Sequence, residues 1–246
     1  MTRKRLDVAL VDRGLAPTRA RARDAVARGT VTVDGRVETR PAAPVGEEAR
    51  LAIADPAAAW VSRAALKLVG ALDDFGLSPE GRICLDLGAS TGGFTQVLLA
   101  RGAARVTAID VGHGQLAPIV AADPRVTSIE GLNARDLSAD HLATPPDFVA
   151  ADVSFISLAL ALPPALELAA PGAIGVFLVK PQFEVGRDGI GKGGLVRDPA
   201  AAEAAVGRIE ALLRTHGWTP TGRAEAALAG GDGNQEYVVA AVKSGT

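Results

Sequence analysis

Residues 82–94 read RICLDLGASTGGF, and the fold class of most of the chain can be worked out from this stretch. Its first six residues are mostly apolar, which predicts a short buried strand. Gly88, Gly92 and Gly93 follow, and glycines let the backbone turn tightly and approach a ligand where the next helix begins. The pattern predicts a strand, a tight loop and a helix, which is the repeating unit of an α/β sheet.

Helical and strand-like patterns alternate on both sides of this stretch. We expect a helix over 62–75, another over 94–102, and a series of short apolar strands, at 105–110, 126–129, 147–152, 173–180 and 236–242. Short apolar strands separated by helices predict a doubly wound, mostly parallel, Rossmann-like sheet covered on both faces. Ligands of such sheets bind beyond the carboxyl ends of the strands, so the polar residues that close the apolar runs are the candidates. These residues are Asp86, Asp110, Asp152 and Lys180.

Composition excludes several classes of protein. The 246 residues are 48% hydrophobic and 22% charged, which is enough apolar material for a core and excludes wholesale disorder. Cys84 is the single cysteine, so a disulfide framework and a cysteine-based zinc site are excluded, and the three histidines lack ligand spacing, so we expect no metal. Pro163, Pro164 and Pro171 interrupt the apolar run 155–179, which predicts a buried helix and a strand rather than a membrane span. No apolar leader begins the sequence, so we expect a cytoplasmic protein.

Positive charge is concentrated near the amino end. Residues 1–40 carry 10 Lys/Arg against 5 Asp/Glu, although the net charge of the whole chain is −2. Helical spacing predicts two short helices there, the second capped by Thr18, and Asp34-Gly35 predicts a hairpin. Small residues and a proline in 54–60 are typical of a linker. We therefore expect two domains, 1–59 and 60–246.

The segment 5–37, RLDVALVDRGLAPTRARARDAVARGTVTVDGRV, resembles the S-four type RNA-binding module, and the likeness extends over most of 3–53. Charge alone would also fit a solvated helix face, but the resemblance implies docking on structured RNA. A glycine-rich loop at 181–198 is expected to be a mobile flap that contacts RNA phosphates. The candidate RNA-binding residues are Arg3, Lys4, Arg5, Arg19, Arg21, Arg23, Arg28, Arg187 and Lys192.

The glycine loop favours one cofactor over another. Its spacing differs from the G-x-G-x-x-G of dinucleotide sites, and the carboxylate of Asp86 would repel a pyrophosphate while suiting a cationic amine. Asp110, 24 residues later, is placed to accept hydrogen bonds from ribose hydroxyls. These residues resemble those of class I methyltransferases, which implies S-adenosylmethionine as the cofactor, with the adenine near 133–136. The candidate cofactor-binding residues are Asp86, Gly88, Ala89, Ser90, Gly92, Gly93, Phe94, Asp110, Asn133 and Asp136.

Four charged residues border apolar runs: Lys67, Asp152, Lys180 and Glu236. Two lysines and two acids in such positions predict a mutually neutralised cluster. Their order resembles the catalytic set of FtsJ-related RNA 2′-O-ribose methyltransferases. The segments WVSRAALKL, DLGASTGGFT, DVSFISL, VKPQFEVGR and GNQEY resemble the TlyA family more specifically, which implies ribosomal RNA as the substrate and cytidine as the target.

A ribose hydroxyl must lose its proton as it attacks a methyl group, so the chemistry needs a base or a cation beside it. We assign that role to Lys180, with Asp152 bridging cofactor and hydroxyl and with Lys67 and Glu236 orienting. Repulsion from Lys67 would favour a neutral Lys180, whereas the two acids would favour its ammonium, so the sequence leaves its protonation state open.

Two other functions are weighed against this one. Some relatives of the TlyA family carry a hemolysin label, which makes a membrane-active protein without RNA methyltransferase activity the alternative. A nicotinamide-dependent oxidoreductase is disfavoured by the Asp86-led loop. The oligomeric state, the modified nucleotide and the choice between ribosomal subunits cannot be predicted from the sequence.

Overall fold

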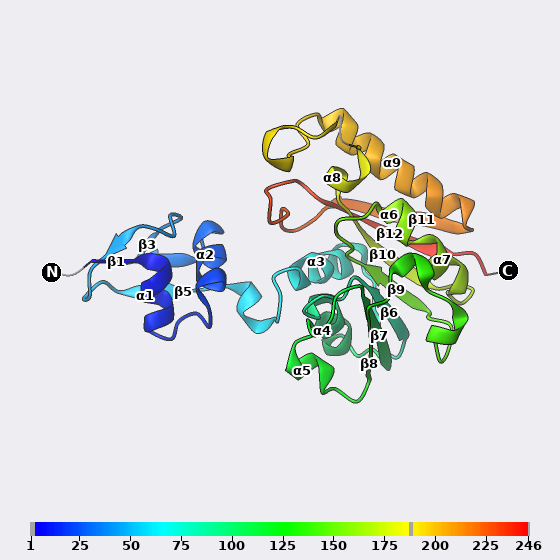
Figure 1. Ribbon diagram of the computed structural model, residues 1–246, viewed down its shortest axis with the longest axis horizontal. Coiled ribbons are helices and arrows are strands. Elements are labelled where there is room, and N and C mark those ends of the chain that lie inside the picture. Colours follow the sequence, from blue (N-terminus) through cyan, green and yellow to red (C-terminus); the bar gives the residue numbers. More distant parts are fainter. Residues whose placement is uncertain (1–2, 187–188, 246) are drawn as a thin grey trace. The chain divides into compact units, whose positions relative to one another are not determined.

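The computed structural model describes residues 3–186 and 189–245 and divides the chain into two compact units (Figure 1). The first unit ends at Ala59 and the second begins at Trp60, and the buried apolar residues of the first unit form a core of their own. Each unit is therefore described by itself.

The first unit packs two helices against small sheets. The side-chain oxygen of Thr18 accepts a hydrogen bond from the backbone N–H of Arg21, so Thr18 caps the second helix as predicted. Asp34 and Gly35 have φ of 52° and 80°, the positive values that a tight two-residue hairpin turn requires. The elements are β1 (Lys4–Arg5), α1 (Leu6–Asp12), α2 (Arg19–Ala27), β2 (Val31–Val33), β3 (Arg36–Val37), β4 (Pro44–Val45), β5 (Leu51–Ile53) and the 3-10 turn η1 (Pro56–Ala59). The strands form the sheets β3-β2-β5 and β1-β4.

The second unit is built on a seven-stranded sheet in the order β11-β12-β10-β9-β6-β7-β8. Strands β10, β9, β6, β7 and β8 pair in parallel, whereas β12 is antiparallel to both of its neighbours. The predicted doubly wound, mostly parallel sheet is confirmed. The strands are β6 (Ile83–Leu87), β7 (Arg105–Asp110), β8 (Val126–Glu130), β9 (Phe148–Ala151), β10 (Ile174–Val179), β11 (Trp218–Glu225) and β12 (Tyr237–Lys243).

Helices cover both faces of this sheet (Figure 1). Side chains alternate along a strand, so Phe148 and Ala150 face one hydrophobic core while Val149 and Ala151 face the other. Helices α3 and α4 pack in the first of these cores, and α6, α7 and α9 pack in the second. The helices are α3 (Ala65–Phe75), α4 (Gly93–Ala100), α5 (Pro118–Ala121), α6 (Leu158–Ala161), α7 (Pro163–Leu168), α8 (Pro181–Glu184) and α9 (Pro199–Thr215), with 3-10 turns η2 (Ala134–Asp136), η3 (Ala139–His141) and η5 (Lys192–Gly194).

Sequence patterns did not predict β11. Every second residue of Trp218–Glu225 is exposed and Pro220 interrupts the run, because β11 is the edge strand of the sheet. Strand β12 runs antiparallel because a loop connects it to β11, without the crossover helix that a parallel strand needs.

The apolar run 155–179 is divided into α6, α7 and β10, as its prolines predict. Across the two ranges that the structure describes, no helix is both long enough and apolar enough to cross a bilayer.

Candidate functional site

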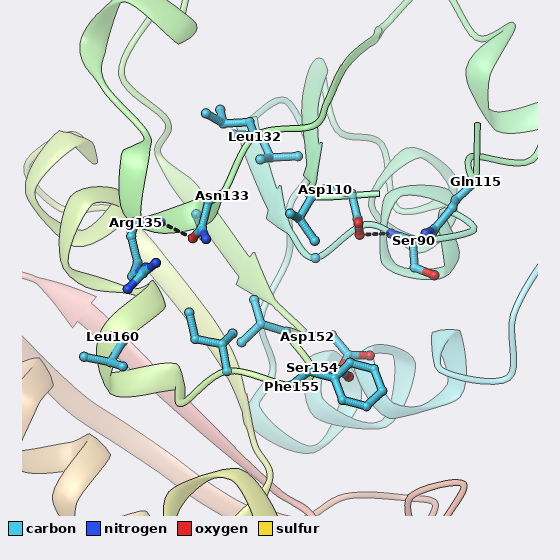
Figure 2. Close-up of a pocket in the computed structure, with 16 residues that line it drawn as sticks. Ser90, Asp110, Gln115, Leu132, Asn133, Arg135, Asp152, Ser154, Phe155 and Leu160 are labelled. Carbon is cyan, nitrogen blue, oxygen red and sulfur yellow. Dashed lines mark hydrogen bonds between the residues drawn. The ribbon is translucent and has the colours of Figure 1, made fainter. Parts of the chain in front are cut away.

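The carboxyl ends of β6, β7 and β9 surround a cavity of about 620 Å³. Figure 2 shows side chains from these three strand ends directed towards it, together with residues of the segment that precedes α6. The polar wall of this large cavity includes Gly88, Ser90, Asp110, Asn133, Asp152 and Ser154. Five of these residues, all but Ser154, were predicted to bind a cofactor or to act in catalysis.

A second, smaller cavity of about 140 Å³ adjoins the first. Both cavities are lined by Gly88, Ser90, Asp152 and Ser154, so they meet where the glycine loop faces the end of β9. Lys180 lines only the small cavity. A ligand in the large cavity would therefore have one end within reach of the groups around Lys180. The small cavity is also lined by three further candidate residues, Ala89, Gly93 and Phe94.

Close approach of the backbone explains two of the glycines. Gly88 has φ of +81°, and a Cβ there would lie 2.7 Å from the carbonyl oxygen of Asp152. Only glycine lets the loop pass this close to the end of β9. Gly92 has φ of +91° and serves packing, because a Cβ there would lie 2.7 Å from Cδ1 of Leu116. Gly92 lines neither cavity.

Asp110 ends β7 on the wall of the large cavity. Its Oδ2 accepts a hydrogen bond of 2.7 Å from the backbone N–H of Ser90, drawn as a dashed line between these two residues in Figure 2. Its Oδ1 accepts one of 2.7 Å from the backbone N–H of Gly112. These bonds fix the carboxylate, and each oxygen keeps capacity for one more donor. Asn133 also lines the cavity, and its Oδ1 accepts from the backbone N–H of Arg135. Asp136 is exposed and lines neither cavity.

Asp86 lies beneath the glycine loop and is fully buried. Its Oδ2 accepts a hydrogen bond of 2.6 Å from the hydroxyl of Thr95, while its Oδ1 has no partner in the described part of the chain. Burial raises the pKa of this carboxyl from 3.8 to about 7. Asp86 lines neither cavity, so the structure places this predicted cofactor residue behind the loop and not on the wall of the site.

The four charged residues of the predicted cluster form two ion pairs. Lys67 Nζ lies 2.6 Å from Glu236 Oε2, and Lys180 Nζ lies 2.5 Å from Asp152 Oδ1. Lys67, Lys180 and Glu236 are each less than 10% exposed. Val179 is the register partner of Tyr237, so Lys180 and Glu236 occupy neighbouring positions at the ends of β10 and β12. The sheet thus places Asp152, Lys180 and Glu236 at one edge, and helix α3 brings Lys67 to Glu236.

In the first unit, a buried carboxylate holds two of the predicted RNA-binding arginines. Asp7 is fully buried and accepts hydrogen bonds from Nε and Nη2 of Arg5 and from Nε of Arg19. These bonds, with that from Arg5 the largest effect, lower the pKa of Asp7 to about 2. The side chains of Arg5 and Arg19 are 47% and 56% exposed, so both guanidinium groups are held in place and remain accessible. We call this group the Asp7 clamp.

Arg28 differs, because its guanidinium binds Asp24 and Asp55 and its side chain is only 14% exposed. Its contacts are those of a residue that fastens α2 to the segment after β5. Among the other predicted RNA contacts, Lys4 pairs with Asp12, Arg21 donates to the backbone oxygen of Ala57, and Arg3, Arg23 and Lys192 are exposed. Arg187 lies outside the described residues.

The loop at 181–198 contains more structure than its glycines suggested. Its first residues form α8, and the stretch after η5 is fastened to the loop before β12. Asn234 accepts a hydrogen bond from the backbone N–H of Val196 and donates one to the carbonyl oxygen of Gly194. Asn234 is itself bonded to Asp232 and is 4% exposed. This part of the expected flap is therefore anchored.

Sequence reasoning missed Ser154 as part of the site, and it missed Asn234 and Asp232 as the residues that anchor the neighbouring loop. Lys180 Nζ donates a hydrogen bond of 2.7 Å to Ser154 Oγ. Ser154 lies in the motif DVSFISL and Asn234 in GNQEY, but neither motif shows which of its polar residues makes these contacts. Within the described ranges, no group of three or more His, Cys, Asp or Glu side chains could hold a metal ion.

Comparison with known families and proteins identifies both units. An FtsJ-like methyltransferase family model matches residues 60–243, and an S4 domain model matches residues 4–51. The chain is 47% identical over 236 residues to the 16S/23S rRNA (cytidine-2′-O)-methyltransferase TlyA of Mycobacterium tuberculosis, covering 96% of this chain and 88% of the relative.

Solved structures agree with this assignment. A Streptococcus thermophilus protein that carries a hemolysin name is 38% identical, with a TM-score of 0.77 over 99% of this chain and 90% of that one. Magnesium protoporphyrin IX methyltransferase of Synechocystis, solved with bound S-adenosylhomocysteine, shares the fold at 15% identity, with a TM-score of 0.51 over 74% of this chain and 83% of that one. The chain therefore belongs to the FtsJ-like methyltransferase family and carries an S4 domain ahead of its methyltransferase domain.

Proposed function

We propose that this protein transfers a methyl group from S-adenosylmethionine to a ribose 2′-hydroxyl of ribosomal RNA, with cytidine as the target nucleoside. The observation that carries the proposal is the Lys180–Asp152 ion pair, which lies where the two cavities meet. The M. tuberculosis relative, whose name states the same reaction and nucleoside, supports the choice of substrate.

The large cavity fits S-adenosylmethionine in size and in chemistry. A volume of about 620 Å³ lies in the range of small-molecule sites. Gly88 lets the loop pass close to the end of β9 along the cavity wall. Asp110 offers carboxylate oxygens at the end of β7, the strand position where ribose hydroxyls of nucleotide ligands bind. The bound cofactor would supply a methyl group on a positively charged sulfur. Acidic residues near the cavity suit this positive charge, whereas a phosphate-binding loop would suit an anionic ligand.

Lys180 is proposed to act on the attacking hydroxyl. A neutral Lys180 would accept the hydroxyl proton, whereas an ammonium would stabilise the developing alkoxide while the hydroxyl proton passes to solvent water. In both cases the oxygen forms a bond to the methyl carbon as the carbon–sulfur bond breaks, and the electron pair of that bond stays on sulfur. Asp152 fixes Lys180, and the Lys67–Glu236 pair is proposed to orient the target ribose. Holding the reacting groups in line supplies much of the acceleration.

The first unit is proposed to dock the RNA. The Asp7 clamp presents two fixed guanidinium groups, and arginine forks match phosphate oxygens. A target ribose in a folded RNA has to leave its stack before its hydroxyl reaches Lys180. Because the proposed substrate is ribosomal RNA, the reaction is proposed to take place in the cytoplasm.

Methylation of ribosomal subunits by the purified protein tests the proposal. Wild-type protein with S-adenosylmethionine is expected to add a methyl group to a cytidine ribose, mapped by mass spectrometry, and Lys180→Ala is expected to lose this activity while remaining folded. Full activity of Lys180→Ala would show that the catalytic assignment is wrong.

Thermal-shift measurements with S-adenosylhomocysteine and with NAD test the oxidoreductase alternative. Stabilisation by S-adenosylhomocysteine but not by NAD would exclude an oxidoreductase, and the opposite result would support one. Leakage from liposomes exposed to the pure protein would favour the hemolysin alternative.

A further inference from the structure

We propose that Ser154 is a positioning residue that, together with Asp152, aims the Nζ of Lys180 at the attacking ribose hydroxyl. The inference rests on the proposed function and adds a residue to which no role in the reaction has been given. Ser154 Oγ accepts a hydrogen bond from Lys180 Nζ at 2.7 Å, and Asp152 Oδ1 lies 2.5 Å from the same nitrogen. Ser154 also lines both cavities, so it stands at their junction.

Two acceptors are enough to fix the direction of a lysine amine. An ammonium has three N–H groups, and a neutral amine has two N–H groups and one lone pair. When Ser154 accepts one N–H and the Asp152 carboxylate, ion-paired at 2.5 Å, occupies a second direction around Nζ, one direction remains. That direction holds an N–H in the ammonium and the lone pair in the neutral amine. The same pair of contacts therefore aims Lys180 in either protonation state.

The chain holds Ser154 in place at some conformational cost. Phe155, the next residue, has φ of +64°, a left-handed conformation that bulky residues seldom adopt. Its ring packs against Phe183 of α8, with centroids 5.6 Å apart. Strain of this kind persists where the surroundings impose it, and it is frequent at functional sites.

A second clasp joins the same two segments. Glu184 of α8 accepts a hydrogen bond of 2.7 Å from the Ser157 hydroxyl and one of 2.6 Å from the backbone N–H of Leu158. The residues that follow β9 are thereby tied to the residues that follow β10. Ser154 lies on the first of these segments and Lys180 begins the second, so their contact is built into the fold.

The test compares Ser154→Ala with Ser154→Thr and with a matched control, Ser128→Ala. Ser128 is an exposed serine on the edge strand β8 and lines neither cavity. For Ser154→Ala we expect kcat to fall about 10-fold to 100-fold, the usual range for loss of a hydrogen bond to a charged group. The thermal midpoint should stay at the wild-type value, because Ser154 is exposed. S-adenosylhomocysteine affinity and RNA KM should change less than kcat, because the proposed role of Ser154 is to position Lys180. Ser154→Thr keeps the hydroxyl and should retain most of the activity.

The split between kcat and KM, together with rescue by Ser154→Thr, separates a positioning role from a merely structural one. Wild-type kcat in Ser154→Ala would overturn the inference, and so would a Ser154→Thr variant that is as impaired as Ser154→Ala. The proposed function would then still stand if Lys180→Ala is inactive. If the wild-type protein methylates no ribosomal RNA, the proposed function fails, and this inference fails with it.

Discussion

Asp86→Asn is expected to reverse a pH-dependent loss of stability in the wild-type protein. Asp86 is fully buried, and its pKa is raised to about 7, mainly because burial disfavours the carboxylate. Between about pH 4 and pH 7 the folded protein keeps a proton that the unfolded chain has released. Stability therefore falls as the pH rises through this window, and it stops falling above pH 7.

The size of the effect follows from the shift in pKa. A change of about three pKa units, at about 1.4 kcal/mol per unit, sets an upper limit of roughly 4 kcal/mol. Asparagine cannot ionise, so Asp86→Asn should be more stable than wild type at pH 8 by up to this amount. For a domain of this size each kcal/mol corresponds to about 2–4 °C in Tm. The two proteins should approach equal stability near pH 4.

Urea unfolding without cofactor, at several pH values between about 4 and 8, measures this difference. Asp140→Asn is the matched control, because Asp140 is exposed and its variant should parallel wild type at every pH. Parallel curves for wild type and Asp86→Asn would refute the reasoning. So would a variant that is less stable than wild type at pH 8.

Three further substitutions test other contacts. Lys67→Met leaves the buried carboxylate of Glu236 without its cation and should lower the free energy of unfolding by about 3–5 kcal/mol in urea. Adding Glu236→Gln should recover much of that stability but not methyl transfer, and no recovery would contradict the pairing. Asp7→Asn should lower the thermal midpoint and the RNA affinity at pH 7. Because the pKa of Asp7 is about 2, the stability that its carboxylate supplies is lost as the pH falls from about 4 towards 2. The difference in thermal midpoint between wild type and Asp7→Asn should therefore narrow in that pH range. Equal midpoints at pH 7 would argue against the Asp7 clamp. Gly88→Ala should abolish binding of S-adenosylhomocysteine in calorimetry, because its Cβ would lie 2.7 Å from the Asp152 carbonyl oxygen, and unchanged affinity would remove the loop from the cofactor site.

Local sequence signals were sufficient for most of the fold. The glycine loop after β6, the cap at Thr18 and the Asp34-Gly35 turn are set by backbone preferences that act over a few residues. Period-two and helical patterns likewise reveal buried strands and helices. Strand β11 was missed for the same reason, because an exposed edge strand lacks a continuous apolar signal.

The candidate site depended more on long-range contacts. Motif resemblance brought Lys67, Asp152, Lys180 and Glu236 together as a set, but only the register of β10 with β12 and the packing of α3 show that they divide into two ion pairs. The roles assigned to them stay predictions. Ser154 could not be singled out, because nothing in its local sequence shows that a lysine 26 residues later donates to it.

The amino-acid order alone was enough to define the α/β class, the glycine loop and the types of chemical group that surround the loop. The reason is that short-range backbone preferences and hydrophobic periodicity are properties of neighbouring residues. Which arginines face outward, which carboxylate is buried without a second partner and which hydroxyl meets Lys180 were decided by folding. Those properties depend on burial and on contacts between residues far apart in the chain, and such contacts exist only once the sheet and its helices have packed.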